Sequence, residues 1–466
     1  MVSATYDGFP AAVGVSRLRV YDWPTVNCGR LPRPSRRAVL AVAAVGLGTA
    51  LTGTLSACSA ASGDTSGITL RFSWWGNDDR AARTEKAVRL FEKEHPGVTV
   101  RTSNSDFGSY LQKLATQAAG GGVPDVVQLD YRQISQYAGG KAIMPLDGAI
   151  KGRTIRTSDM DQDFLRTGTY KGRQFALPMG RGITGYAYDS AVYKKAGIPT
   201  PRPSWTWQDW AEANKKIAAL GLKSPDGRPY TGSNDGGDNE DVFETWLRSR
   251  GKNLYADQTE LGFNEDDLTA FWSFRDRLRR EGAIAQARDT VQAGSTETSP
   301  IGRRLAAADF TWDAPFPGYT ALLGEDIHFA PVPTTDGRQG AYFKPSMLLG
   351  IGANSKHPQE AAQLIDFLLN DPRAGDILGF SRSTPPNRKI AARVAKTLEG
   401  PEREIYDYAQ TMEKYGLDAP PTAPPPGDLA IQTALNRGYQ RVMYGMATPR
   451  QAAREFIDEA NRELES

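Results

Sequence analysis

The stretch ITLRFSWWGNDDRAARTEKAVRLFEKEHPGVTV, residues 68–100, predicts how the chain begins to fold. ITLRFSW, residues 68–74, alternates apolar and polar residues as a β-strand does. Residues 79–95 place their apolar side chains at helical spacing, and the Pro-Gly pair that follows ends the helix. Residues 98–101 then begin a second strand. A strand, a helix and a strand at this spacing predict parallel strands with the helix on one face of the sheet.

The same alternation continues along the chain. Residues 110–119 predict a helix, and DVVQL, residues 125–129, predicts a short buried strand. Farther on, MLLGIGANS, residues 347–355, reads as an apolar strand turning into an amphipathic helix. The fold class is therefore α/β. A chain of 466 residues is long enough for two sizeable domains.

Composition excludes several classes of function. The formal charge of +2 gives no electrostatic argument for binding nucleic acid. Three His and two Cys argue against a His/Cys metal site and a disulfide framework, so no metal and no cofactor is expected. Catalytic motifs such as G-x-S-x-G and H-E-x-x-H are absent from suitable settings. A Ser/His triad is disfavoured because no His accompanies a candidate nucleophile.

A basic and then apolar segment precedes the predicted fold. SRRAVLAVAAVGLGTALTGTLSACSAASG, residues 35–63, has arginines, an uncharged run and small residues before Cys58, which are the parts of an export signal. A permanent membrane helix is the competing interpretation, but Gly, Thr and Ser lower the hydrophobicity of the run.

LSAC, residues 55–58, resembles a bacterial lipobox, and SRRAVLA, residues 35–41, is similar to a twin-arginine export motif. The lipobox implies that residues 1–57 are an N-terminal extension and lipoprotein signal peptide. Cys58 would carry the lipid, and residues 58–67 would form a polar tether on the outer face of the cell membrane.

Several segments, in order, resemble the extracellular solute-binding proteins of ABC importers, the family that includes maltose-binding proteins. They include GGVPDVVQLD, YKGRQFALPMGRGITGYAYDSAVYKKAGI, PSWTWQDWAEANKKI and GIGANSKHPQEAAQLIDFLL. The resemblance implies a two-lobed periplasmic-binding-protein-like fold, with hinge crossovers and a cleft between the lobes. It implies one lobe of residues 68–180 with 313–351, and a second of residues 181–312 with 352–466.

Sugars bind through aromatic rings and planar polar side chains, and α/β proteins present such groups at the C-terminal ends of strands. Trp74, Trp75 and Asp78 follow the first strand, although strand alternation predicts that one of the two Trp residues is core. Asp130 follows the third strand, where it accepts sugar hydroxyls or caps a helix. The remaining candidate ligand contacts are Arg181, Asn234, Asp235, Trp312, Asp313, Lys344 and Arg382.

The resemblance implies a lipid-anchored monomer that captures a carbohydrate, by preference an oligosaccharide, by closing its cleft. It would deliver the solute to the membrane subunits of an ABC permease and would not be an enzyme. Two alternatives stay open. One is a secreted glycosidase, which needs two carboxylates flanking one bond, and the other is a binder of a non-sugar solute such as a glycerol phosphodiester.

Overall fold

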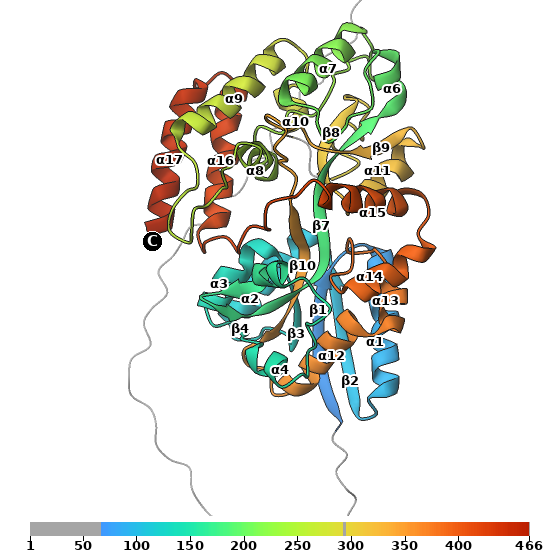
Figure 1. Ribbon diagram of the computed structural model, residues 1–466. Helices are drawn as coiled ribbons and strands as arrows, with labels where there is room; N and C mark the ends of the chain where they lie inside the picture. Colours follow the sequence, from blue (N-terminus) through green and yellow to red (C-terminus); the bar gives the residue numbers. More distant parts are fainter. Residues whose placement is uncertain (1–66, 292–294, 466) are drawn as a thin grey trace, which may run out of the picture. The chain divides into compact units, whose positions relative to one another are not determined.

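The computed structural model describes residues 67–291 and 295–465 (Figure 1). Its main sheet has the strand order β2-β1-β3-β10-β7-β8, while β4 pairs with β10 and β9 pairs with β7. The strands are β1 (Ile68–Trp75), β2 (Val98–Ser105), β3 (Val126–Leu129), β4 (Ile143–Met144), β7 (Ala176–Asp189), β8 (Ala308–Trp312), β9 (Ile327–Ala330) and β10 (Phe343–Gly352). A separate hairpin joins β5 (Thr169–Tyr170) to β6 (Arg173–Gln174).

The parallel arrangement predicted from residues 68–129 is confirmed. β1 pairs in parallel with both β2 and β3, and α1 (Asp78–Glu94) and α2 (Phe107–Ala119) connect the three strands. β10 differs, because it enters the sheet antiparallel to β3 and β7. The fold is therefore α/β with a mixed sheet.

The helices cover the sheet and build the rest of the chain. Besides α1 and α2, they are α3 (Ile134–Gly139), α4 (Asp147–Lys151), α5 (Gln162–Leu165), α6 (Ser190–Lys195), α7 (Trp207–Ala219), α8 (Glu240–Arg248), α9 (Glu265–Arg280), α10 (Ala287–Thr290), α11 (Phe316–Leu323), α12 (Pro358–Asn370), α13 (Pro372–Leu378), α14 (Arg388–Val394), α15 (Gly400–Glu413), α16 (Asp428–Met443) and α17 (Pro449–Glu465). Three short 3₁₀ helices are η1 (Tyr131–Gln133), η2 (Arg166–Gly168) and η3 (Ala395–Thr397).

Separate hydrophobic cores define two lobes. The first lobe packs β1, β3, β4 and the C-terminal half of β10 against α1, α2, α12 and α13. The second lobe contains two cores, one built on α7, α8, α9, α16 and α17, and the other on α11, β9 and α15. In Figure 1 the lobes lie below and above the middle of β7.

Two strands run through both lobes. In β7, Ala176 and Leu177 belong to the core of the first lobe, whereas Ile183 and Ala187 belong to the second. β10 crosses back, with its first residue, Phe343, in the second lobe and residues 347–351 in the first. β7 therefore passes between the lobes at residues 180–182, and β10 at residues 344–346.

The packing divides the chain differently from the boundaries expected at residues 312 and 351. Residues 313–343 stay in the second lobe because β8 and β9 both pair with the C-terminal half of β7. Residues 352–378 stay in the first lobe, where α12 and α13 pack against α1. The chain returns to the second lobe only at α15.

Candidate functional site

A cavity of about 280 Å³ lies where segments of both lobes meet. The first lobe supplies Tyr131 and Arg132 of η1, and the crossover of β10 supplies Lys344. The second lobe supplies residues of α8 and of the loop after it. One wall is a proline-rich segment, residues 419–424, here called the strap. The lining residues are Tyr131, Arg132, Glu240, Asp241, Glu244, Arg248, Asn253, Leu254, Tyr255, Ala256, Lys344, Ala419, Pro420, Pro421, Thr422 and Pro424.

The first turn of α8 places two carboxylates in this cavity. Asn239 caps the helix, and its side chain accepts the backbone N–H groups of Asp241 at 2.9 Å and Val242 at 3.3 Å. Acidic residues in a first turn are favoured by the partial positive charge of a helix N-terminus. Glu240 and Asp241 therefore stand at a position that stabilises negative charge.

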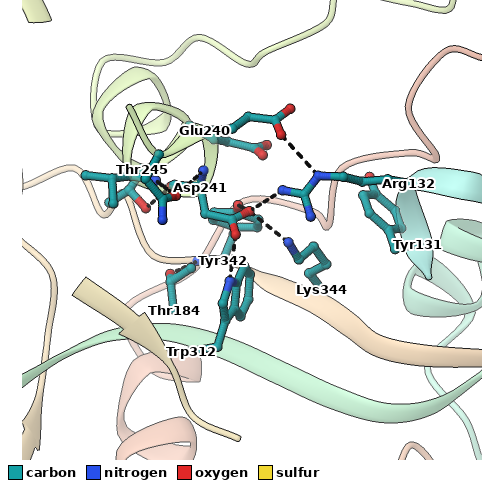
Figure 2. A network of polar contacts seen from close by, with 12 residues as sticks. Tyr131, Arg132, Thr184, Glu240, Asp241, Thr245, Trp312, Tyr342 and Lys344 are labelled. Carbon is teal, nitrogen blue, oxygen red and sulfur yellow. Dashed lines mark hydrogen bonds and ion pairs between the residues drawn. The ribbon is translucent and has the colours of Figure 1, made fainter. Parts of the chain in front are cut away.

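Asp241 accepts hydrogen bonds from four side chains (Figure 2). Its Oδ1 accepts from Arg132 Nη2 at 2.9 Å and Lys344 Nζ at 2.8 Å, and more weakly from the hydroxyl of Tyr342 at 3.3 Å. Its Oδ2 accepts from Trp312 Nε1 at 2.8 Å. Burial alone would raise the pKa of Asp241, but the two cations outweigh it and hold the pKa well below its usual value. Asp241 is thus ionised.

Arg132 connects the lobes. Its Nε donates to Glu240 Oε2 at 3.0 Å, in addition to the bond from Nη2 to Asp241. η1 follows β3 directly, so the C-terminal end of a parallel strand delivers this guanidinium to the second lobe. The backbone N–H of Arg132 is fixed by Asp130 Oδ1 at 2.9 Å. Asp130 was predicted either to accept sugar hydroxyls or to cap a helix, and in the structure it caps η1.

Glu244 and Arg248 form a looser pair deeper in the same wall. Arg248 Nη1 lies 3.7 Å from Glu244 Oε1, while the guanidinium donates to Asn253 Oδ1 at 3.0 Å and to the strap carbonyl of Ala419 at 2.7 Å. Among the described residues, no hydrogen bond reaches the carboxylate of Glu244. Burial raises the pKa of Glu244. This carboxylate therefore keeps acceptor capacity toward the cavity.

Two of the residues predicted from the sequence meet at Asp241. Lys344 places its ammonium 4.2 Å from the centroid of the Trp312 ring while both side chains donate to the same carboxylate. Lys344 lines this cavity, Trp312 instead lines a smaller cavity that shares Asp241, and the other predicted contacts line neither. Arg181 pairs with Glu413 and stacks on Phe343, with 3.5 Å from its guanidinium carbon to the ring centroid.

The predicted contacts of the first lobe are turned away from the cavity. Trp74 is fully buried beside Phe72, and Trp75 packs against Phe107 and Tyr110. Asp78 is exposed in the first turn of α1. Arg382 is buried and donates to Gln128 at 3.2 Å and Thr84 at 2.7 Å, so it ties a loop to the lobe.

The predicted contacts of the second lobe also have structural partners. Asp235 is buried and accepts the hydroxyl of Tyr439 at 2.8 Å, and Asn234 bonds to the backbone N–H of Asp235. Asp313 is buried at the crossover, where it accepts Ser383 Oγ at 3.0 Å. Cys58 lies outside the described residues.

Sequence reasoning missed the carboxylates of α8, and Arg248 and Tyr255 with them. In the polar segment SNDGGDNED, residues 233–241, the predicted contacts were Asn234 and Asp235, and the acidic residues at its end were not among them. The helix cap was the sequence signal that could have identified them. An Asn followed directly by Glu-Asp marks a helix start, and the side chains of the first helical turn point out of the loop.

Comparisons with known proteins agree with this architecture. A family model described as bacterial extracellular solute-binding protein matches residues 75–373. An uncharacterized lipoprotein in the oleD 5'region of Streptomyces antibioticus is 25% identical over 343 residues, which cover 68% of this chain and 70% of that one.

Solved structures show the same fold. An extracellular solute-binding protein family 1 from Alicyclobacillus acidocaldarius is 30% identical, with a TM-score of 0.65 and coverage of 86% of this chain and 99% of that one. A periplasmic oligogalacturonide binding protein from Yersinia enterocolitica, in complex with saturated digalacturonic acid, has a TM-score of 0.70 at 23% identity, covering 85% and 99% of the two chains. At that identity the likeness concerns the fold alone.

Proposed function

We propose a function from the premise that the chain belongs to the bacterial extracellular solute-binding protein family: it captures a neutral carbohydrate in the cavity beside Asp241. One observation carries the proposal. The cavity joins both lobes, and each of its cations is paired with a carboxylate. Closure of the lobes around a solute would be stabilised by contacts from both sides.

The pairing of charges favours a neutral solute over an anion. Arg132 and Lys344 are engaged by Asp241, and Arg248 lies beside Glu244. A phosphate would have to displace these carboxylates or lie beside them, which costs free energy through like-charge repulsion. Hydroxyl groups both donate and accept, so they can use the remaining N–H groups of the cations and the acceptor capacity of Glu244. Tyr131 and Tyr255 add aromatic surface for the C–H faces of a sugar.

The wider role follows the family. The protein would hold an oligosaccharide at the outer face of the membrane, anchored through a lipid on Cys58, and deliver it to an ABC permease. The relative named as a lipoprotein supports the anchor. No helix among the described residues is long and apolar enough to cross a bilayer. Metabolic labelling with a radioactive fatty acid tests the anchor: label should enter the wild type and be lost in Cys58→Ala.

Calorimetric titration of the purified protein with monosaccharides, neutral oligosaccharides and a glycerol phosphodiester tests the solute class. A neutral sugar should bind and stabilise the protein thermally, and its affinity should drop in Glu244→Gln, which removes the acceptor charge. Tight binding of the phosphodiester alone would overturn the proposal. Hydrolysis of a glycoside, abolished in Glu244→Gln, would instead favour a glycosidase.

A further inference from the structure

Two carboxyl groups, Glu240 and Asp428, meet behind Arg132. Asp428 is the first residue of α16, the helix that follows the strap in the chain, and is fully buried. Its Oδ1 accepts the hydroxyl of Tyr255 at 2.7 Å. Glu240 Oε2 accepts from Arg132 Nε at 3.0 Å and from Gln432 Nε2 at 2.9 Å.

One oxygen of this pair has no donor. Among the residues that the structure describes, none donates a hydrogen bond to the buried Asp428 Oδ2, and its distance of 3.7 Å from Arg132 Nε is too long for a hydrogen bond. Glu240 Oε2 lies 3.0 Å from the same Arg132 Nε, so one nitrogen brings the two carboxyl groups together. Adjacent buried carboxylates repel strongly unless a proton lies between them. A proton on Asp428 Oδ2 would satisfy the orphaned oxygen by donating to Glu240.

The balance of charges around this pair also favours one shared proton. Glu240, Asp241 and Asp428 carry three negative charges when all are ionised, and within residues 67–291 and 295–465 only Arg132 and Lys344 pair with them. One shared proton makes this group neutral. The titratable and charged groups facing the carboxyl pair are Tyr131 and Arg132 of η1, Asp241, Glu244 and Arg248 of α8, Tyr255 of the following loop, and Lys344 of β10.

We propose that Glu240 and Asp428 share one proton while Arg132 joins the lobes, and that this proton makes solute capture pH-dependent. The inference rests on the proposed capture of a solute in this cavity. Loss of the proton leaves one uncompensated negative charge at a buried junction between lobes. The closed arrangement is then destabilised relative to an open one, in which water reaches the carboxylates.

Proton linkage gives the direction in which solute affinity changes with pH. Burial, and then the charge of Glu240, raise the pKa of Asp428 well above its usual value despite the opposing effect of Arg132. A group that holds its proton more tightly in the closed form favours that form at low pH, and the advantage is lost as pH rises through the raised pKa. Solute affinity should therefore fall with rising pH, by at most about tenfold per pH unit, the limit for one linked proton.

The test titrates a bound neutral sugar into the wild type and Asp428→Asn across roughly pH 5 to 9. Asn keeps the shape of the side chain without an ionisable proton, so the decline in affinity seen in the wild type should flatten in this variant. Glu240→Gln should flatten it in the same way. Glu459→Gln is the matched control, since Glu459 pairs with Arg437 at an exposed site, and it should keep the wild-type slope.

Infrared difference spectroscopy supplies a readout that needs no solute. The spectrum of the wild type minus that of Asp428→Asn should contain a protonated-carboxyl C=O band that persists at mildly alkaline pH. Absence of this band, or sugar affinity with equal pH slopes in the wild type and Asp428→Asn, overturns the shared proton. A protein that binds no solute at any pH but shows the band contradicts the proposed function and leaves the shared proton standing.

Discussion

Trp312 donates its indole N–H to Asp241 Oδ2 at 2.8 Å, and this bond joins the end of β8 to the first turn of α8. The ring is thereby held at a fixed angle, with Lys344 over one face and Tyr342 packed edge-on at 5.4 Å between centroids. Trp312, predicted from the sequence to contact the solute, thus orients the central carboxylate of the cavity.

Trp312→Phe should lower sugar affinity while the protein stays folded. The substitution keeps an aromatic ring but removes a hydrogen bond to a charged group, which contributes about 1.5–3 kcal/mol, so the dissociation constant should rise at least tenfold. Calorimetry measures the affinity, and a thermal melt checks the fold. Tyr444→Phe, at an exposed helix end, is the control. Unchanged affinity in both Trp312→Phe and Trp312→Ala would remove this residue from the site.

Asp241→Asn should reduce both stability and affinity. It leaves Arg132 and Lys344 without their shared carboxylate, at a cost of about 1–3 kcal/mol in the free energy of unfolding. Urea unfolding and sugar titration measure the two effects. Asp407→Asn breaks an exposed helical pair with Arg403, so it should change stability by only about 0.3–0.5 kcal/mol. Equal losses in the two variants would contradict the central role of Asp241.

Gly180→Ala should destabilise the crossover of β7. A Cβ atom at this position would stand 1.5 Å from the carbonyl oxygen of Arg382, so the backbone must move, at a cost of about 1–3 kcal/mol or more. Gly148→Ala in α4 is the control, because a Cβ there meets no atom within 4 Å. Chemical unfolding should separate the two variants clearly. A wild-type midpoint in Gly180→Ala would show that this contact is not tight in solution.

Asp313 should make stability depend on pH. Burial raises the pKa of Asp313 to about 7, although Ser383 and the backbone N–H of Ala314 oppose the shift. An unfolded Asp has a pKa of about 3.9. Between that pH and about pH 7 the folded state therefore binds more protons at this site than the unfolded state does. The free energy of unfolding contributed by this carboxyl should fall as pH rises through that window.

Asp313→Asn should remove this contribution. Because Asp238 and Asp309 also have pKa values raised to about 7, the test is the difference between the wild type and Asp313→Asn in urea unfolding at pH values on both sides of the window. The variant should gain stability relative to the wild type as pH rises. A pH-independent difference would contradict the raised pKa.

The fold could be predicted from sequence more fully than the site. Strands and helices of residues 68–129 follow from local periodicity, and their parallel order follows from the length of the connections. The antiparallel entry of β10 depends on a partner strand, β7, more than 150 residues earlier, and no local pattern in residues 343–352 reports it. The expected crossovers at residues 312 and 351 failed for the same reason.

The candidate contact residues were harder to predict than the fold, because the position of a residue along the chain does not give the direction in which its side chain points. Trp74 and Trp75 follow each other in a strand and should face opposite sides, yet both are buried, since α2 covers the side that Trp75 faces. Asp235 and Asp241 lie in one loop and its helix, but the first turns toward Tyr439 in the core and the second toward Lys344. Trp312 was predicted from an expected crossover that the packing does not show, and Lys344 from its place before the apolar strand; both nevertheless donate to Asp241.

The continuous strands β7 and β10 limit how the lobes can move. A pair of hydrogen-bonded strands resists stretching and sliding but bends and twists out of its plane. Because these two strands pair with each other across the junction, the lobes have few degrees of freedom besides one bending motion. The rate of solute exchange would then depend on how easily this short piece of sheet bends. Substitutions in it should change the rates of solute binding and release even where the substituted residue does not touch the solute.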